Sequence, residues 1–403
     1  MVRVLVVLNG VIGGANRSAT DLVRYLPSNR YEGCIAYPTG LSASVEALEA
    51  ACPRTGAVYL PLWRRLNAPF LQRLRTGLSS TVRSGAHIRS GLRIRRFCRD
   101  WEVGLIHTNT SLTLTPALTA RALGLPHVWH IRELIGAGMS FRYLSNDRLA
   151  ARTFSALSDR IVANSEQTAA FFRKYLGEDS VTVIPNGIPE PPHDPALQGA
   201  TLRASLGIPA SALVIGLVAS LNATWKNHHY AIRAAEPLLR QRADTYLVLY
   251  GDVPDTPYAN SVRVTVQALG AQARMAGYVA DPWAIMGSLD ILAHGTARES
   301  FGRVFVEAML AGKPVVAPRG GGALSVVQDG ETGFLTDPER PGDMTALLER
   351  LAENPTLRHR LGEAGKLRAR AQFSVAAHVQ AMCRVYDEVL AAREVRQHWV
   401  TQR

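Results

Sequence analysis

Short apolar runs alternate with segments of helical periodicity along most of the chain. Runs rich in valine, isoleucine and leucine predict buried strands. In the first half they fall at 2–8, 31–36, 57–60, 103–107, 127–131, 159–163 and 181–184, and a second series falls at 213–219, 245–250, 289–293 and 315–317. Because helical patterns separate these runs, the order of elements is typical of an α/β protein with helices on both faces of its parallel sheets.

A proline-rich segment separates the two series. Residues 189–195 contain four prolines and suit neither a helix nor a central strand, so we interpret them as an interdomain linker. A length of 403 residues also favours two domains. After residue 335 the chain is predicted to be helical, with a break at Asn354-Pro355 and a last long helix over about 375–399.

The stretch from Ala293 to Gly322 predicts a strand, a loop, a helix and a second strand. Glu299 and Glu307 are eight residues apart, and a helix that begins near Ser300 places them two turns apart on one side, with Arg303 between them. These three charges could form a solvated stripe of ion pairs. The rest of the helix is almost entirely apolar, however, so the carboxylates could instead bind a ligand. The residues alone leave both interpretations open.

Five further residues are candidates for ligand contacts. Gly13-Gly14 follow the first strand and precede a helix predicted from Asn16, as its N-cap, to Leu26; exposed amides there could hold an anion, although a simple tight turn explains the glycines equally well. His107 and His130 end predicted strands, where parallel sheets bind ligands. Lys226 is predicted in the first turn of a helix, where a cation is unfavourable unless an anion is bound.

Composition and charge narrow the class of protein. Apolar residues make up 47% and charged residues 19% of the chain, which excludes a disordered protein. No apolar run approaches the roughly 18 residues of a membrane span, and the first run is too short for a signal peptide. The four cysteines are scattered, so we expect reduced thiols in a cytoplasmic protein. No D-x-D sequence is present, and we predict no metal.

Positive charge is concentrated in residues 61–100, which hold ten arginines and one acid. Apolar residues recur there at helical spacing from Trp63 to Phe97, with the arginines between them. This pattern favours an interfacial helix on an anionic membrane, with an ordinary solvated basic face as the alternative. Because no recognition motif accompanies the charge, nucleic acid is not a predicted partner.

Several motifs now line up in order. They are Gly13-Gly14 after the first strand, Ile184-Pro185-Asn186-Gly187-Ile188 at the domain junction, Gly277-Tyr278-Val279, and an E-x7-E element from Glu299 to Glu307 that is followed by Gly312-Lys313-Pro314. Over nearly its whole length the chain resembles glycosyltransferase family 4, retaining enzymes of the GT-B architecture. The resemblance implies two Rossmann-like domains facing a cleft: 1–190 on the acceptor side and 200–372 binding the nucleotide sugar. It also implies that the last helix, 375–403, returns to the first domain.

The resemblance assigns the donor, a nucleotide-diphosphate sugar, to the second domain. Glu307 would accept hydrogen bonds from the ribose, and Glu299 would accept them from hydroxyls of the transferring sugar, near the amides of Phe301 and Gly302. Lys226 would neutralise the diphosphate leaving group.

The remaining roles that the resemblance implies fall on both domains. Backbone groups near Val279 would hold the base. Gly13 and Gly14 would let the first domain's backbone approach the diphosphate and the acceptor, and His130 would contact the sugar at the reaction centre.

One position departs from the family pattern. The family usually has Gly-Arg before the lysine loop, with the arginine on phosphate, whereas Ala219-Ser220 stand here. Phosphate binding would then depend on Lys226 and amides, with Arg303 as a candidate replacement, or donor affinity would be weakened.

The function that the resemblance implies is transfer of a sugar, with retention of configuration and without a metal or other cofactor, to a saccharide or lipid-linked saccharide acceptor. Cell-surface polysaccharide or glycolipid synthesis is the expected setting, in the cytoplasm and peripherally on the inner membrane face. Two alternatives stay open: a related sugar-nucleotide epimerase, and a non-catalytic GT-B module that binds a sugar nucleotide or a partner. The sequence does not identify the donor sugar, its base, the acceptor or the oligomeric state.

Overall fold

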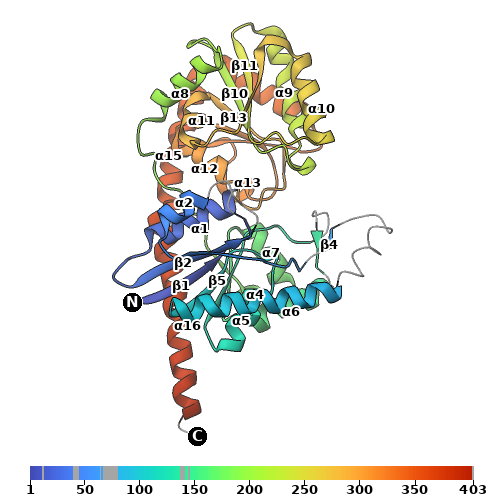
Figure 1. Cartoon of the computed structure of the whole chain (residues 1–403). Coiled ribbons are helices and arrows are strands. Elements are labelled where there is room, and N and C mark those ends of the chain that lie inside the picture. The colour runs from blue at the N-terminus through green and yellow to red at the C-terminus, as the bar shows by residue number, and fades with distance from the viewer. Residues whose placement is uncertain are drawn as a thin grey trace. The chain divides into compact units, whose positions relative to one another are not determined.

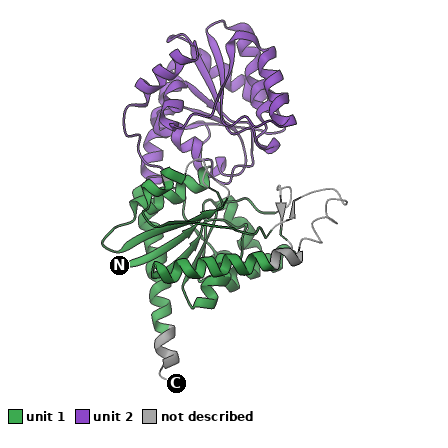
Figure 2. Ribbon diagram, in the orientation of Figure 1, with its two compact units in different colours: residues 1–187, 375–403 green, residues 188–374 purple. Residues whose placement is uncertain are grey.

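The computed structural model describes residues 1–10, 13–39, 45–63, 65–66, 80–136, 141–143 and 146–401 (Figure 1). The chain forms two compact units (Figure 2): unit 1 comprises 1–187 and 375–403, and unit 2 comprises 188–374. Each unit is built on a parallel sheet with helices on both faces, which confirms the predicted α/β class.

The main sheet of unit 1 has seven parallel strands in the order β3-β2-β1-β5-β6-β8-β9. The order reverses direction between β1 and β5, so the carboxyl ends of these strands meet at a topological switch point, where such sheets bind ligands. The strands are β1 Val2–Val7, β2 Tyr31–Pro38, β3 Thr55–Val58, β5 Val103–Thr108, β6 His127–Ile131, β8 Arg160–Ala163 and β9 Thr182–Val183. Two residues each of β4 (Arg65–Leu66) and β7 (Phe141–Arg142) form a separate antiparallel pair.

Helices cover both faces of this sheet. They are α1 Gly14–Tyr25, α2 Val45–Ala51, α4 Ser80–Asp100, α5 Thr115–Leu123, α6 Asp147–Leu157, α7 Glu166–Leu176, the 3-10 turn η1 Glu178–Ser180, and α16 Val375–Thr401. The apolar positions of α16 pack with α1 and β1 in one core, where Met382 and Tyr386 are fully buried. Burying a side chain of the size of Met382 contributes about 1.5–3 kcal/mol, so the last helix is an integral part of unit 1.

Unit 2 has a six-stranded parallel sheet in the order β12-β11-β10-β13-β14-β15. Its strands are β10 Leu213–Val218, β11 Thr245–Tyr250, β12 Ala273–Gly277, β13 Ile291–Ala293, β14 Val315–Pro318 and β15 Gly333–Thr336. Its helices and 3-10 turns are α8 Pro195–Ser205, η2 Thr224–Lys226, α9 His228–Gln241, α10 Pro257–Ala268, η3 Gly270–Gln272, α11 Pro282–Ser288, α12 Arg303–Leu310, α13 Ala323–Val326, α14 Pro341–Glu353 and α15 Pro355–Gln372.

The chain passes between the units twice, at 187–188 and at 374–375. An isolated parallel bridge joins Ile188 to Ser374, so the first and last residues of unit 2 lie side by side. The predicted linker, 189–195, leads directly into α8, whose N-cap is the Asp194 carboxylate.

Two local predictions in unit 1 were wrong. Helix α1 begins at Gly14 and not at Asn16, because Gly13 at φ +109° turns the chain and its carbonyl accepts from Arg17 N at 3.0 Å. The helix expected to begin at Trp63 is absent there: Trp63 is buried against Tyr143, its amide donates to Leu112 O at 2.7 Å, and Arg65–Leu66 form a strand. Aromatic packing thus overrides the helical spacing at that point. Residues 64 and 67–79 lie outside the described residues.

All four cysteines are buried and form no disulfide. In the part of the chain that the structure describes, no helix is both long enough and apolar enough to cross a membrane.

Candidate functional site

Three polar side chains meet at the carboxyl edge of the unit 2 sheet. Lys226 closes the turn η2, His294 follows β13, and Glu299 lies in the loop before α12. The Lys226 ammonium forms an ion pair with Glu299 Oε1, and His294 Nε2 lies 3.1 Å from the same oxygen. We call these three residues the lysine–glutamate–histidine cluster. His294 was not among the predicted site residues, although it stands directly after β13, and His107 and His130 were predicted from a similar position near strand ends.

The predicted helical stripe through Glu299, Arg303 and Glu307 was wrong in its first member. Gly302 has a left-handed backbone (φ +83°), so α12 begins only at Arg303 and Glu299 precedes the helix. Likewise, Asn227 at φ +52° separates Lys226 from α9, so Lys226 belongs to the short turn before the helix. The two acids therefore lie in different elements: Glu299 in a loop and Glu307 on α12.

Glycines allow the loops of the cluster to approach each other. A Cβ on Gly295 would overlap the backbone carbonyl of Asn227, so only glycine lets the loop after β13 lie against the end of η2. A Cβ on Gly322 would overlap the backbone of Phe301, and the Gly322 amide donates to Glu299 O at 2.7 Å. The loop at Gly322 thus holds the backbone at Glu299 in place.

The electrostatics of the cluster favour an ionised Glu299. Burial opposes its charge, but the Lys226 ammonium and the hydrogen bond from His294 outweigh burial and hold the pKa of Glu299 well below its usual range. The side chains of Lys226 and Glu299 are 18% and 15% exposed. The Lys226 ammonium also lies 4.3 Å from the centre of the Trp225 ring, which adds a cation–π contact.

The second acid of the E-x7-E element pairs with its own helix. Glu307 Oε1 accepts from Arg303 Nε at 2.8 Å, one turn apart on α12, and both side chains are at least nine-tenths buried. Phe301, whose amide the resemblance assigns to the donor, buries its ring against Phe373. Arg303, the candidate replacement for the missing arginine, is therefore engaged with Glu307.

The other predicted residues of unit 2 lie at neighbouring strand ends. Ser220 follows β10, and its hydroxyl lies 3.4 Å from Asp252 Oδ2 after β11. Gly251 permits this approach, because a Cβ there would overlap the Ala219 carbonyl. Val279, in the loop after β12, is half-buried and packs against the core.

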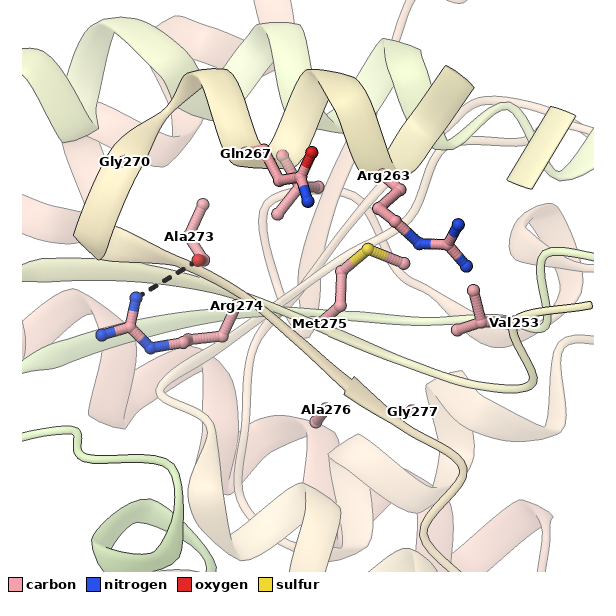
Figure 3. Close-up of a pocket in the computed structure, with 10 residues that line it drawn as sticks. Val253, Arg263, Gln267, Gly270, Ala273, Arg274, Met275, Ala276 and Gly277 are labelled. Atoms are coloured by element: carbon pink, nitrogen blue, oxygen red, sulfur yellow. Dashed lines mark hydrogen bonds between the residues drawn. The ribbon is translucent and has the colours of Figure 1, made fainter. Parts of the chain in front are cut away.

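A cavity of about 610 Å³ runs between α10 and the edge strand β12 (Figure 3). The Arg263 guanidinium and the Met275 thioether lie on its wall (Figure 3), and Gly277 is one of its lining residues. None of the predicted site residues lines it, so the cavity is separate from the lysine–glutamate–histidine cluster.

In unit 1, His130 lies in β6 and is completely buried. Its ring is stacked on His107 at 5.4 Å between ring centres and lies 6.0 Å from His378 of α16. His107 Nδ1 lies 2.6 Å from the Tyr386 hydroxyl, whereas neither ring nitrogen of His130 has a hydrogen-bond partner among the described residues. Burial, with the neighbouring Arg132 charge, holds the pKa of both His107 and His130 well below the usual value.

A polar network that begins at Arg132, next to this histidine stack, was not predicted. The Arg132 guanidinium is buried and donates to the side-chain oxygens of Asn109, at 2.9 Å, and Asn186. The next residue, Glu133, accepts from Thr110 Oγ1 at 2.6 Å and Ser111 N at 2.9 Å. The sequence did contain one sign of this network. Asn109 directly follows β5 and Arg132 directly follows β6, at the carboxyl edge of the sheet.

Gly13 and Gly14 lie at the carboxyl end of β1, exposed, where Gly13 is the N-cap of α1. No group of three or more metal-ligating side chains occurs in the described ranges. The predicted residues thus divide between the units: Gly13, Gly14 and His130 in unit 1, and Ser220, Lys226, Val279, Glu299, Phe301, Gly302, Arg303 and Glu307 in unit 2.

Two doubly wound parallel sheets, with polar side chains at their carboxyl edges and a last helix that belongs to the first unit, define the GT-B class of fold. Two family models match the chain: Glycosyltransferase Family 4 over residues 12–190 and Glycosyl transferases group 1 over residues 200–368. The chain belongs to glycosyltransferase family 4, as its motifs predicted.

Curated relatives include D-inositol 3-phosphate glycosyltransferases. The Streptomyces avermitilis protein is 32% identical over 60% of this chain and 55% of its own length, and the Corynebacterium glutamicum protein is 31% identical over 54% of each. The matched segments thus span about half the length of these relatives.

Solved structures share the fold. Anabaena HepE, in complex with UDP and glucose, has a TM-score of 0.75 at 24% identity, covering 96% of this chain and all of that one. A glycosyltransferase from Rickettsia africae has a TM-score of 0.76 at 18% identity, covering 96% and 98%.

Proposed function

We propose that this protein is a retaining glycosyltransferase that moves a sugar from a nucleotide-diphosphate sugar to a saccharide or lipid-linked saccharide acceptor. The lysine–glutamate–histidine cluster carries the proposal, because it holds an ammonium and an ionised carboxylate together at a carboxyl strand edge. Family membership and the inositol-phosphate glycosyltransferases among the relatives support it.

The donor is proposed to bind in unit 2. Glu299 accepts from sugar hydroxyls, Glu307 accepts from the ribose, and backbone groups near Val279 hold the base. Lys226 neutralises the diphosphate as it leaves, which is where negative charge develops during transfer. In unit 1, His130 is proposed to contact the transferring sugar, because its buried ring nitrogens have no other partner among the described residues.

The phosphate contacts differ from the usual family pattern. Ser220 carries no charge, so we propose that Lys226, the amides of the turn before α9 and Arg303 share the diphosphate. Arg303 would have to keep or exchange its ion pair with Glu307 when the donor binds. Weaker donor affinity is the expected consequence.

The first test is turnover of UDP-, GDP- and ADP-sugars by the purified protein, with Glu299→Gln, Lys226→Ala and, as a control on α15, Lys366→Ala. We expect hydrolysis or transfer by the wild type and the control, and a loss of 100-fold or more in the two site variants. Equal rates in all four proteins would refute the site. Donor conversion with no acceptor would favour the epimerase, and tight nucleotide binding without turnover would favour the non-catalytic module.

Two further experiments test retention of the anomeric configuration and activity without a metal ion. The anomeric configuration of the product, read by NMR, should equal that of the donor sugar. Activity should survive removal of divalent metals by a chelator, because Lys226 supplies the positive charge at the leaving group. Inversion, or a metal requirement, would refute these two parts separately.

We further propose that the protein acts in the cytoplasm, on the anionic inner face of the membrane, in cell-surface polysaccharide or glycolipid synthesis. The exposed face of α4 supports this: Ile88 and Leu92 are 64% and 60% exposed, among arginines that are also exposed. The exposed arginines of this helix are Arg89, Arg93, Arg95, Arg96 and Arg99. Apolar side chains within a basic helix face suit an anionic interface.

Co-sedimentation with vesicles tests the membrane proposal. Anionic vesicles should carry the protein down and neutral vesicles should not. Replacing Ile88 and Leu92 by serine, or Arg89, Arg93 and Arg96 by glutamine, should weaken binding several-fold, while Lys174→Gln on α7 should leave it unchanged. If the α4 variants co-sediment as well as the wild type, the proposal that this face of α4 binds the membrane is refuted.

A further inference from the structure

The two oxygens of the Glu299 carboxylate have different partners. Both the Lys226 ammonium and His294 Nε2 contact Oε1. Among the described residues Oε2 has no hydrogen-bond or ion-pair partner, and it is not one of the fully buried atoms that lack a partner, so it keeps exposed surface. A carboxylate oxygen has two lone pairs and only accepts, so Oε1 is filled by its two donors and Oε2 is left open.

The position of His294 is fixed by packing. Its ring is 1% exposed and stands edge-on to Phe305 of α12, with 5.0 Å between ring centres and 85° between the planes. Its backbone amide donates to Val316 O at 2.9 Å. Gly302 leaves room for the Phe305 ring, which a Cβ there would overlap. The start of α12 therefore holds the imidazole against the loop of Glu299.

The tautomer of His294 follows from its partners. Because an ionised carboxylate cannot donate, Nε2 must carry a proton. Nδ1 is buried without a partner among the described residues, so a second proton there would be a buried, unsatisfied donor. The neutral imidazole with Nε2–H thus fits the site.

We propose that His294 is a positioning residue for the donor. Together with Lys226 it occupies Oε1 of Glu299, and it thereby turns Oε2 toward the ligand as the carboxylate oxygen that accepts from the hydroxyls of the donor sugar. Without His294, Lys226 alone allows the carboxylate to rotate and to present either oxygen. The inference rests on the proposed function, since it assigns a sugar to this site.

The proposal separates sugar recognition from nucleotide recognition. His294 bonds to Glu299 and has no hydrogen bond among the described residues to Lys226, Arg303 or Glu307, which are proposed to hold the nucleoside diphosphate. Its loss should therefore weaken binding of the sugar more than binding of the nucleoside diphosphate. Two substitutions separate the hydrogen bond from the packing: His294→Gln keeps an N–H donor at the place of Nε2, and His294→Met keeps an apolar side chain without a donor.

The test is calorimetric titration of the full chain with UDP and UDP-glucose, GDP and GDP-mannose, and ADP and ADP-glucose, continuing with the pair that the wild type binds. We expect His294→Met to weaken binding of the sugar nucleotide about tenfold and binding of the nucleoside diphosphate less than threefold. His294→Gln should bind both ligands nearly as tightly as the wild type. In turnover assays His294→Met should raise KM more than it lowers kcat. His359→Met, an exposed histidine of α15, is the control and should change neither constant.

A double-mutant cycle shows whether His294 acts through Glu299. In a Glu299→Gln background, His294→Met should cause little further loss, whereas a general structural role would add its full effect. Equal losses for both ligands, additive losses in the cycle, or failure of His294→Gln to restore binding would each overturn the inference. If the wild type binds no sugar nucleotide, the proposed function itself fails; if it binds one and His294→Met is unchanged, only the role of His294 fails.

Discussion

The two units place polar side chains at equivalent sheet edges and satisfy them differently. In unit 2, Lys226 and His294 both bond to Oε1 of Glu299, and the other carboxylate oxygen is left open. In unit 1, His130 is completely buried and has no hydrogen-bond partner among the described residues. A paired cluster is organised before any ligand arrives, whereas an unpaired buried imidazole lowers stability until a ligand bonds to it. The difference indicates that the cluster in unit 2 is preformed, whereas the ring nitrogens of His130 in unit 1 are unsatisfied.

The largest effect should come from breaking the pair in unit 2. Lys226→Met leaves the mostly buried Glu299 carboxylate without its main counter-charge, and we expect a stability loss of about 2–3 kcal/mol together with at least a 100-fold loss of activity. The double variant Lys226→Met/Glu299→Gln should recover most of the stability and none of the activity. Chemical denaturation and turnover assays measure both, and a single variant as stable as wild type would show that the cluster is not preformed.

A smaller effect should follow from disturbing the loop backbone. Gly322→Ala introduces a Cβ that overlaps the Phe301 backbone, at a position without backbone strain (φ −63°). We expect a loss of about 1–3 kcal/mol, as for overpacking, together with weakened donor binding. Gly342→Ala in α14 has open space and is the matched control; it should be neutral or slightly stabilising. Equal thermal shifts for both variants would mean that the loop is not held by its glycines.

Acid should destabilise unit 1 more than unit 2. Burial lowers the pKa of His107, His127 and His130 in unit 1, that of His127 to about 3, while in unit 2 it lowers the pKa of His228 to about 4. Below the ordinary value near 6.5 the unfolded chain binds protons that the folded chain does not, so stability falls with falling pH by up to about 1.4 kcal/mol per unit for each such histidine.

Amide hydrogen exchange at pH 7 and pH 5.5, corrected for intrinsic rates, measures this loss of stability in each unit separately. Unit 1 amides should lose more protection than unit 2 amides, because unit 1 has more of these buried histidines. The reverse order would contradict the comparison.

The smallest effect should distinguish two neighbouring histidines. His130→Leu removes unpaired buried nitrogens, so the stability of the ligand-free protein should stay level or rise by about 1 kcal/mol. His107→Leu leaves the Tyr386 hydroxyl without its partner and should cost about 1–3 kcal/mol. Unfolding free energies of the two variants decide this, and a large loss for His130→Leu would show that its ring is satisfied in the folded protein.

Apolar periodicity was sufficient to predict the α/β class, because buried parallel strands and amphipathic helices follow from it directly. The same periodicity failed at Trp63, which is not helical and packs its ring against Tyr143. The starts of α1 and α12 were also misjudged, because they are set by positive φ angles at Gly13 and Gly302 that no side-chain pattern encodes.

The candidate site was also only partly predictable from the sequence. Glu299 stands in the E-x7-E element and Lys226 was a cation at a predicted helix start, whereas His294 joins them only through tertiary packing on Phe305. Arg132 and Glu133 likewise gain their partners from loops that lie far away in sequence. Their position after a strand was visible in the sequence, but their hydrogen bonds were not.

The central claim is that unit 2 binds a nucleotide-diphosphate sugar through the cluster around Glu299. A thermal-shift panel of UDP-, GDP- and ADP-sugars, run on the wild type and on Glu299→Gln, tests it most directly. A ligand at 100 times its Kd stabilises the folded state by about 2.7 kcal/mol. The wild type should therefore show a clear rise in Tm with one donor, and Glu299→Gln should show a much smaller rise. No rise with any donor, or equal rises in both proteins, would contradict the claim.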